Sequence, residues 1–342
     1  MTQTPSPSLA PAGPARPAPG APYAPGRTRR ALRLAAGLAC VPYLTLKIAW
    51  ILGSRVGIPE GSSLLDHRAQ MIVANAVTVL MDAAVVVLAL LLTRPWGLRT
   101  PAPLLAVPMW IATGLLTPIM AGYPLQLLLA AFGAGGEGPS ARSASEPFLA
   151  DWVFAVVYTG FIVQGIALGS LFVLYARDRW GHLWRGRTGD LPRPAGRGPR
   201  IVAAGAALLA LFPGTLHLLW AAGSTAGLDA ARAKDRTADF HVLEGLDVLY
   251  LVAAVGGVLV VAFRWLPGLP VKVPLALAFA GSGAVGCWGG WLLLASLLRP
   301  ADDVAAAPTA PTLLTYSVQM IIGLCVAAAG LGLVRERAVA GA

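Results

Sequence analysis

The sequence predicts an all-α integral membrane protein of eight transmembrane helices, arranged as two parallel four-helix repeats. Three observations carry this prediction. Only 12% of the residues are charged and 56% are hydrophobic, whereas a soluble domain carries roughly a quarter charged residues. Apolar runs of about 20 residues, the length of a helix that spans a bilayer core, recur along the chain. The segment from Thr45 to Gly57 also returns 170 positions later, from Thr215 to Gly227.

The predicted elements follow in order from a first segment rich in Pro and Ala. Residues 1–30 lack apolar periodicity and predict a disordered cytoplasmic tail. The eight predicted spans are 33–53, 69–93, 102–122, 151–176, 201–222, 240–263, 273–298 and 312–334. A further apolar run, 124–133, is too short to span the bilayer. It extends the third helix, lies at the membrane interface or re-enters the membrane.

Basic residues between the spans predict the orientation. They concentrate in every second loop, at Arg94, Arg99, Arg177, Arg179, Arg185, Arg187, Arg193, Arg197, Arg200, Arg264 and Lys272, and at both ends of the chain. The loops between them are acidic or balanced in charge. Under the positive-inside rule this pattern predicts a plasma-membrane protein with both termini in the cytoplasm.

The repeat divides the chain into two similar halves. The predicted units are a first four-helix repeat (31–176), an Arg-rich cytoplasmic linker (177–200), a second four-helix repeat (201–335) and a short cytoplasmic tail (336–342). Because four is even, both halves enter the membrane in the same direction. This predicts a pseudo-two-fold axis along the membrane normal, unlike the inverted repeats of many transporters.

The repeated segment carries a polar helix face in each half. Its members at i, i+3 and i+7 are Lys47, Trp50 and Ser54 in the first copy and His217, Trp220 and Ser224 in the second. Acidic residues on the next helix of each half offer partners: Asp82 for Lys47, and Asp247 or Glu244 for His217. We therefore expect one buried polar pair per half. Such a pair either fixes helix packing or serves function.

Metal and cofactor sites have little support in the sequence. His241 and Glu244 stand at i, i+3, and His67 lies near the same predicted surface, so these three are the candidate metal ligands. We nevertheless expect no metal and no cofactor. The three cysteines all fall inside apolar segments without a pair spacing. The G-x-G-x-x-G string at 281–286 lies inside a predicted span, which indicates helix packing rather than dinucleotide binding.

One resemblance accompanies these patterns. The segment from Thr215 to Leu228 resembles the L-H-x-x-W-x-x-G-G signature of a family of short, four-helix bacterial membrane proteins of unknown function. The segment from Thr45 to Ile58 is similar but has Lys47 at the histidine position, and both copies have Gly-Ser for Gly-Gly. The richness in Ala, Gly, Pro and Arg resembles that of an actinobacterial protein. Neither resemblance implies an activity.

Three functional classes fit the sequence. The first is a non-enzymatic membrane component, such as a sensor, accessory subunit or structural protein. The second is a permease for a small solute with a polar path between the two halves. The third is a membrane-embedded enzyme with a His/Glu site near the outer face. The lipid bilayer is the expected partner. Nucleic acid is not, because the arginines cluster in particular loops. The sequence leaves homo-oligomers and protein partners open.

Overall fold

The computed structural model describes residues 26–60, 62, 65, 68–133, 149–191, 197–234, 236–298 and 307–340. Eight helices in this part are long and apolar enough to cross a membrane, as the hydropathy pattern predicts. They are α1 (Arg27–Ile51), α2 (Arg68–Leu91), α3 (Ala102–Ala131), α4 (Asp151–Trp180), α5 (Gly198–Ala221), α7 (Ala238–Phe263), α8 (Lys272–Leu297) and α9 (Ala310–Ala340). The shorter elements are η1 (Pro95–Arg99), η3 (Gly181–Trp184), η4 (Thr188–Asp190) and α6 (Ala230–Lys234).

The first and last helices are longer than predicted. α1 already begins at Arg27, so the end of the predicted tail 1–30 is helical. α9 continues to Ala340 and takes in most of the predicted tail 336–342. Arginine, glutamate and alanine are strong helix formers, and the helices therefore continue beyond their apolar runs. Residues 1–25 lie outside the described part of the chain.

The apolar run 124–133 belongs to α3, which continues through it as far as Ala131. Three prolines, Pro108, Pro118 and Pro124, lie inside this helix without ending it. Each proline removes one backbone donor but keeps a helical φ angle. Neighbouring helices in a membrane protein can supply hydrogen bonds to the backbone groups that proline leaves free. α3 is therefore a single long helix, and the run is a helix extension.

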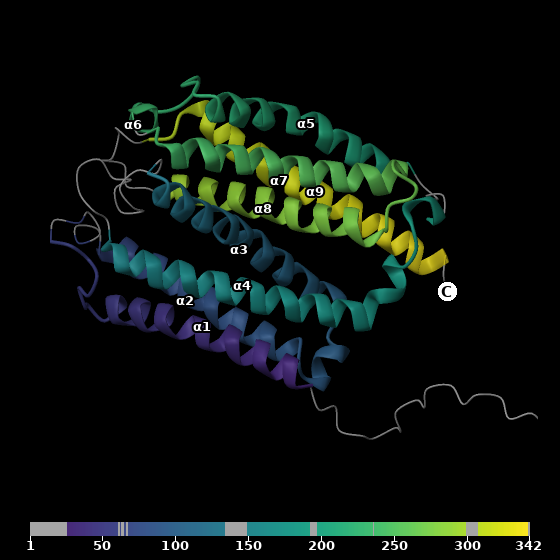
Figure 1. Ribbon diagram of the computed structural model, residues 1–342, viewed down its shortest axis with the longest axis horizontal. Coiled ribbons are helices and arrows are strands. Elements are labelled where there is room, and N and C mark those ends of the chain that lie inside the picture. Colours follow the sequence, from purple (N-terminus) through teal and green to yellow (C-terminus); the bar gives the residue numbers. More distant parts are fainter. Residues whose placement is uncertain are drawn as a thin grey trace, which may run out of the picture.

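The eight helices form two groups that lie side by side in Figure 1. In the first helix group α1 packs against α2 and α4, and α3 packs against α4. In the second helix group α5 packs against α7 and α9, and α8 packs against both of these. The two groups meet mainly where α3 contacts α8. α1 begins and α9 ends at one end of the bundle, here called the terminal end; the opposite end is the distal end.

Glycines let α8 approach three other helices closely. A Cβ on Gly281 would lie 2.5 Å from a backbone nitrogen of α7, and one on Gly283 would lie 3.0 Å from a backbone oxygen of α3. A Cβ on Gly286 would lie 2.9 Å from a backbone carbon of α9. These contacts confirm that the G-x-G-x-x-G string serves helix packing. They also place α8 between the two groups.

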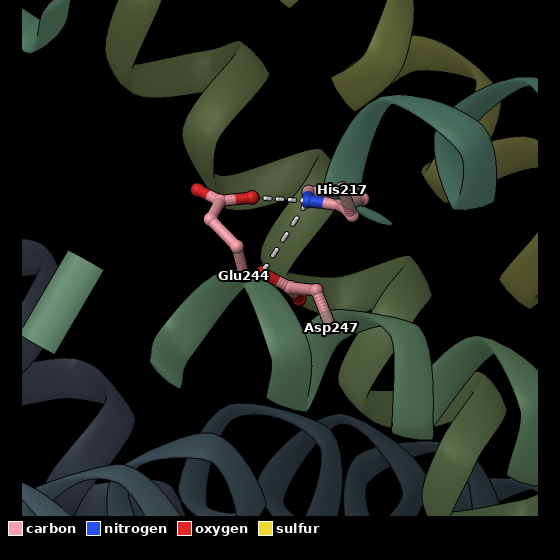
Figure 2. Close-up of side chains that lie close together, drawn as sticks. All are labelled: His217, Glu244 and Asp247. Atoms are coloured by element: carbon pink, nitrogen blue, oxygen red, sulfur yellow. Dashed lines mark hydrogen bonds and ion pairs between the residues drawn. The ribbon is translucent and has the colours of Figure 1, made fainter. Parts of the chain in front are cut away.

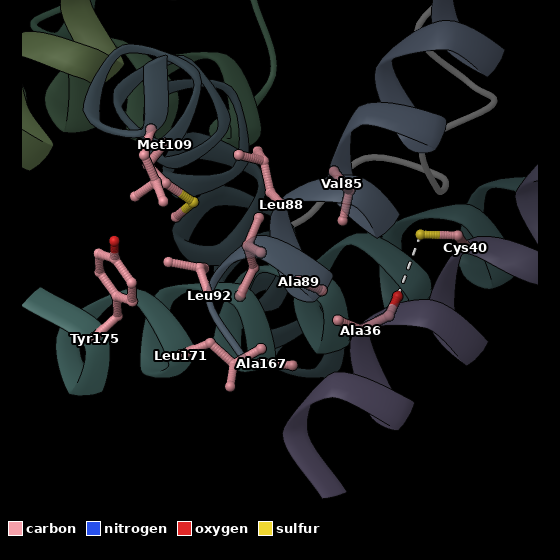
Figure 3. Close-up of a cluster of buried hydrophobic side chains, with 12 residues drawn as sticks. Ala36, Cys40, Val85, Leu88, Ala89, Leu92, Met109, Ala167, Leu171 and Tyr175 are labelled. Atoms are coloured by element: carbon pink, nitrogen blue, oxygen red, sulfur yellow. Dashed lines mark hydrogen bonds between the residues drawn. The ribbon is translucent and has the colours of Figure 1, made fainter. Parts of the chain in front are cut away.

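Apolar side chains fill the interior of the first helix group (Figure 3). The buried cluster consists of Ala36, Cys40, Val85, Leu88, Ala89, Leu92, Leu105, Met109, Ala167, Leu168, Leu171 and Tyr175. Large apolar side chains also face outward, with Leu38 67%, Leu80 70% and Leu208 70% exposed. A lipid-facing surface accounts for this outward apolar face, because water would penalise it.

The linker between the two groups is attached to the loop between α7 and α8. The backbone N–H of Thr188 donates to the carbonyl of Leu269, and that of Gly189 donates to the carbonyl of Pro267, each at 2.9 Å. The Thr188 hydroxyl, which is fully buried, donates to the carbonyl of Leu266 at 2.5 Å. The loops of the terminal end are thereby held together.

Candidate functional site

The repeated segment forms the same helix ending twice. Gly53 follows α1 with φ +97°, and Gly223 follows α5 with φ +96°. The N–H of Ser54 donates to the carbonyl of Ala49, five residues back, at 2.9 Å, and the equivalent bond after α5 measures 2.8 Å. This pattern is the Schellman motif, whose left-handed position favours glycine.

The tryptophan of each copy holds the loop that follows the helix. The indole N–H of Trp50 donates to the carbonyl of Val56 at 2.7 Å, and that of Trp220 donates to the carbonyl of Ala226 at 2.8 Å. Both side chains are almost fully buried, at 3% and 2% exposure. The two tryptophans therefore lie inside the protein and support its distal loops.

The serines complete these loops and do not join a polar site. The hydroxyl oxygen of Ser54 accepts from the N–H of Val56 at 3.3 Å, and that of Ser224 accepts from the N–H of Ala226 at 3.2 Å. Of the polar helix face predicted in each half, the tryptophan and serine thus make local loop contacts. The first position, Lys47 or His217, is the one whose ionisable group lies near acidic side chains of the next helix.

Lys47 is half-buried between aromatic rings. Its Nζ lies 4.9 Å from the ring centroid of Tyr43 and 5.0 Å from that of Trp50. Both distances fit a cation–π contact. The expected partner, Asp82, lies close enough to interact electrostatically. Among the described residues, however, no ion pair joins the two side chains.

Asp82 bonds to α4 instead. Its Oδ1 accepts from the side-chain amide of Gln164 at 3.2 Å, which makes this glutamine a link between α2 and α4. The side chain of Asp82 is 3% exposed, and its Oδ2 has no hydrogen-bond partner. The first helix group therefore contains two ionisable side chains that are close but not paired.

His217 forms the pair that the sequence predicts in the second helix group. Its Nδ1 lies 2.5 Å from Oε2 of Glu244 and 3.9 Å from Oδ2 of Asp247 (Figure 2). Its Nε2 lies 2.9 Å from the amide nitrogen of Gln319 on α9. Both ring nitrogens therefore have partners on other helices. His217 on α5 and Gln319 on α9 are 102 positions apart in the chain.

The surroundings of His217 combine rings and opposite charges. The imidazole contacts the edge or face of the Trp220 ring at 5.2 Å between centroids. Arg232 on α6 is close enough to His217 to interact electrostatically. Its guanidinium lies 5.9 Å from the Tyr316 ring and 3.7 Å from the carboxylate of Asp229. The site thus lies near the distal end, where α5 ends.

Three of these side chains form a set of possible metal ligands. The ligand atoms of His217, Glu244 and Asp247 all lie within 4.8 Å of one another. Of the candidate ligands that the sequence suggested, only Glu244 belongs to this set. His241 instead places its Nδ1 3.0 Å from the carbonyl of Trp220. His67 lies outside the described residues.

Glycines and tryptophans form much of the contact between the two helix groups. α3 and α8 meet there through glycine, since a Cβ on Gly114 would lie 2.3 Å from the carbonyl oxygen of Gly283. The indole of Trp110 donates to the Ser282 hydroxyl at 3.0 Å, and that of Trp288 donates to the Leu115 carbonyl at 3.1 Å.

Sequence reasoning paired His217 with the next helix but missed Tyr316 and Arg232. Gln164 and Gln319 were visible as amides in corresponding helices, which is the signal that could have linked them to the ionisable residues. Comparison of the chain with protein-family models, with curated proteins and with solved structures found no match. A function for this chain is therefore inferred from the geometry of the site alone.

Proposed function

We propose that the chain is a non-enzymatic plasma-membrane protein, a sensor or accessory subunit, that binds a divalent transition-metal ion at His217, Glu244 and Asp247. The observation that carries this proposal is the convergence of one imidazole nitrogen and two carboxylates within 4.8 Å. Nitrogen and oxygen donors of this kind suit zinc and its first-row neighbours.

Charge balance supports a divalent ion. Glu244 and Asp247 stand at i, i+3 on α7, so their carboxylates lie on one helix face. Two negative charges at this depth repel each other, and burial in a membrane protein raises their cost. His217, once protonated, balances one of them. A divalent ion bound to neutral His217 balances both, and the site becomes electrically neutral.

Gln319 suits the role of an outer-sphere group. A metal on Nδ1 of His217 leaves a proton on Nε2, which then needs an acceptor. Flipping the side-chain amide of Gln319, so that its nitrogen and oxygen exchange places, presents the carbonyl oxygen to that proton. The Nε2–amide separation of 2.9 Å already has hydrogen-bond length. The ion itself requires the 2.5 Å contact between His217 and Glu244 to open to roughly 3 Å.

Two parallel repeats also form part of this proposal. The equivalent helix endings, 170 positions apart, support it. So does the packing order, in which α1 pairs with α2 and α4 as α5 pairs with α7 and α9. The metal site then belongs to one repeat only, because the first repeat has Lys47 at the position of His217.

Zinc titration of the purified protein tests the site. After chelator treatment, the protein in detergent should bind one zinc ion by calorimetry. His217→Gln, Glu244→Gln and Asp247→Asn should each weaken binding by at least about 100-fold, more than the 10–100-fold typical of outer-sphere changes. The matched controls are His241→Gln and His182→Gln, which should bind as the wild type does. Unchanged zinc binding in His217→Gln would refute the proposal.

A further inference from the structure

The carboxyl group of Asp82 is more isolated than an ionised carboxylate in a membrane should be. It lies near the middle of α2 and is 3% exposed. Only Oδ1 has a hydrogen-bond partner, the amide of Gln164, while Oδ2 has none. An ionised carboxylate can accept about four hydrogen bonds, and leaving it nearly bare in a low-dielectric interior is costly. A neutral carboxylic acid in the same place costs far less.

The position of Lys47 is consistent with a neutral Asp82. The Lys47 ammonium lies over the rings of Tyr43 and Trp50 and makes no ion pair with Asp82. In a low-dielectric environment a lysine and an ionised aspartate within reach attract strongly, and the lysine stem is flexible. The ammonium would leave the rings for an ionised partner. Its place on the rings is the arrangement expected when that partner carries no charge.

Within the described residues, Lys47 is the one charged group found to act on Asp82. The titratable groups that face Asp82 from α1 are Cys40, Tyr43 and Lys47. α4 contributes the neutral amide of Gln164. This amide serves either form of the acid, because its N–H donates to a carboxylate and its carbonyl accepts from a carboxylic O–H.

We propose that Asp82 is a proton-binding site that alternates between two partners. With its proton bound, Asp82 is neutral and the Lys47 ammonium rests on the Tyr43 and Trp50 rings. When the O–H bond breaks, one proton leaves to water and the electron pair stays on the carboxylate. The Lys47 ammonium then moves to Asp82 and forms an ion pair between α1 and α2. No other reactant is needed, and the site changes by one unit of charge.

Infrared spectroscopy tests the proton directly. A protonated side-chain carboxyl gives a C=O stretching band that is separate from the bands of carboxylates and shifts in deuterium oxide. The wild type in detergent at neutral pH should show this band, and Asp82→Asn should lose it. Asp178→Asn is the matched control, because Asp178 is exposed and paired with Arg29, and it should leave the band unchanged. A neutral-pH wild-type spectrum without an Asp82 band would overturn the proposal.

The role of Lys47 has its own readout. Removing a cation that stabilises the carboxylate favours the neutral acid. In Lys47→Met the band should therefore persist to higher pH than in the wild type, which tests the proposal even if Asp82→Asn folds poorly. Equal pH profiles in the two proteins would overturn the proposal that Lys47 moves to Asp82.

A change of cation tests whether Asp82 binds a proton or a metal cation. Replacing potassium with sodium in the buffer should leave the band unchanged. Loss of the band in sodium would show that Asp82 binds sodium instead of a proton.

Discussion

Gly223 is the residue on which the second copy of the repeated segment depends. Its φ of +96° lies in the left-handed region, where a side chain costs roughly 1–2 kcal/mol. A Cβ at this position would meet no atom within 4 Å. The cost of Gly223→Ala therefore comes from the backbone alone.

We predict that Gly223→Ala lowers the free energy of unfolding by about 1 kcal/mol. Gly256→Ala is the control, because this α7 glycine also has open space around it and lies within a helix. Alanine there should be neutral or stabilising. Reversible unfolding in mixed detergent micelles measures both variants. Equal stability of the two would contradict the role of the glycine in the helix ending.

Gln319 permits a second prediction at the residue scale. Gln319→Leu removes the group that orients the Nε2 side of His217 but leaves the three proposed ligands in place. Zinc affinity should fall by roughly 10–100-fold, as is typical for outer-sphere partners of a ligating histidine. Calorimetric titration measures the change. Gln164→Leu makes the same substitution in the other helix group, and a comparable loss there would show that the effect is not local.

At the scale of the element, α3 and α8 depend on close backbone approach. We predict that Gly114→Ala loosens this contact, because its Cβ would lie 2.3 Å from a carbonyl oxygen of α8. Overpacking of this kind costs typically 1–3 kcal/mol. Gly330→Ala on α9 is the control, since nothing lies within 4 Å of its Cβ. Thermal unfolding should separate the two variants, and equal melting temperatures would exclude the tight contact.

The elements also show how far the sequence could predict the molecule. The length of the apolar runs predicts the eight spans, because a helix that crosses a bilayer needs about 20 apolar residues. Helical spacing identifies residues on one face, such as Glu244 and Asp247. It does not identify contacts across helices, so the bond from His217 to Gln319 was hidden. Helical spacing also does not show which of several possible partners a side chain contacts. The sequence therefore predicted Asp82 as the partner of Lys47 and not the rings of Tyr43 and Trp50.

At the scale of the whole molecule, the terminal end of the bundle carries many exposed basic residues. In the described part, exposed basic residues of the terminal end include Arg94, Arg99, Arg177, Arg185, Arg187, Arg197, Lys272 and Arg335. Exposed tryptophans accompany them, with Trp96 49% and Trp265 55% exposed. Basic residues favour the cytoplasmic side, and tryptophan favours the membrane interface. This distribution supports a cytoplasmic terminal end.

We predict that cysteine labelling places the two ends on opposite sides of the plasma membrane. The native cysteines are first replaced with serine. Thr225→Cys at the distal end should then react with a membrane-impermeant maleimide in intact cells, because Thr225 is exposed and follows the last turn of α5. Arg187→Cys in the exposed linker should react only after the membrane is permeabilised. Labelling of Arg187→Cys alone in intact cells would reverse the orientation and place the His217 site on the cytoplasmic side.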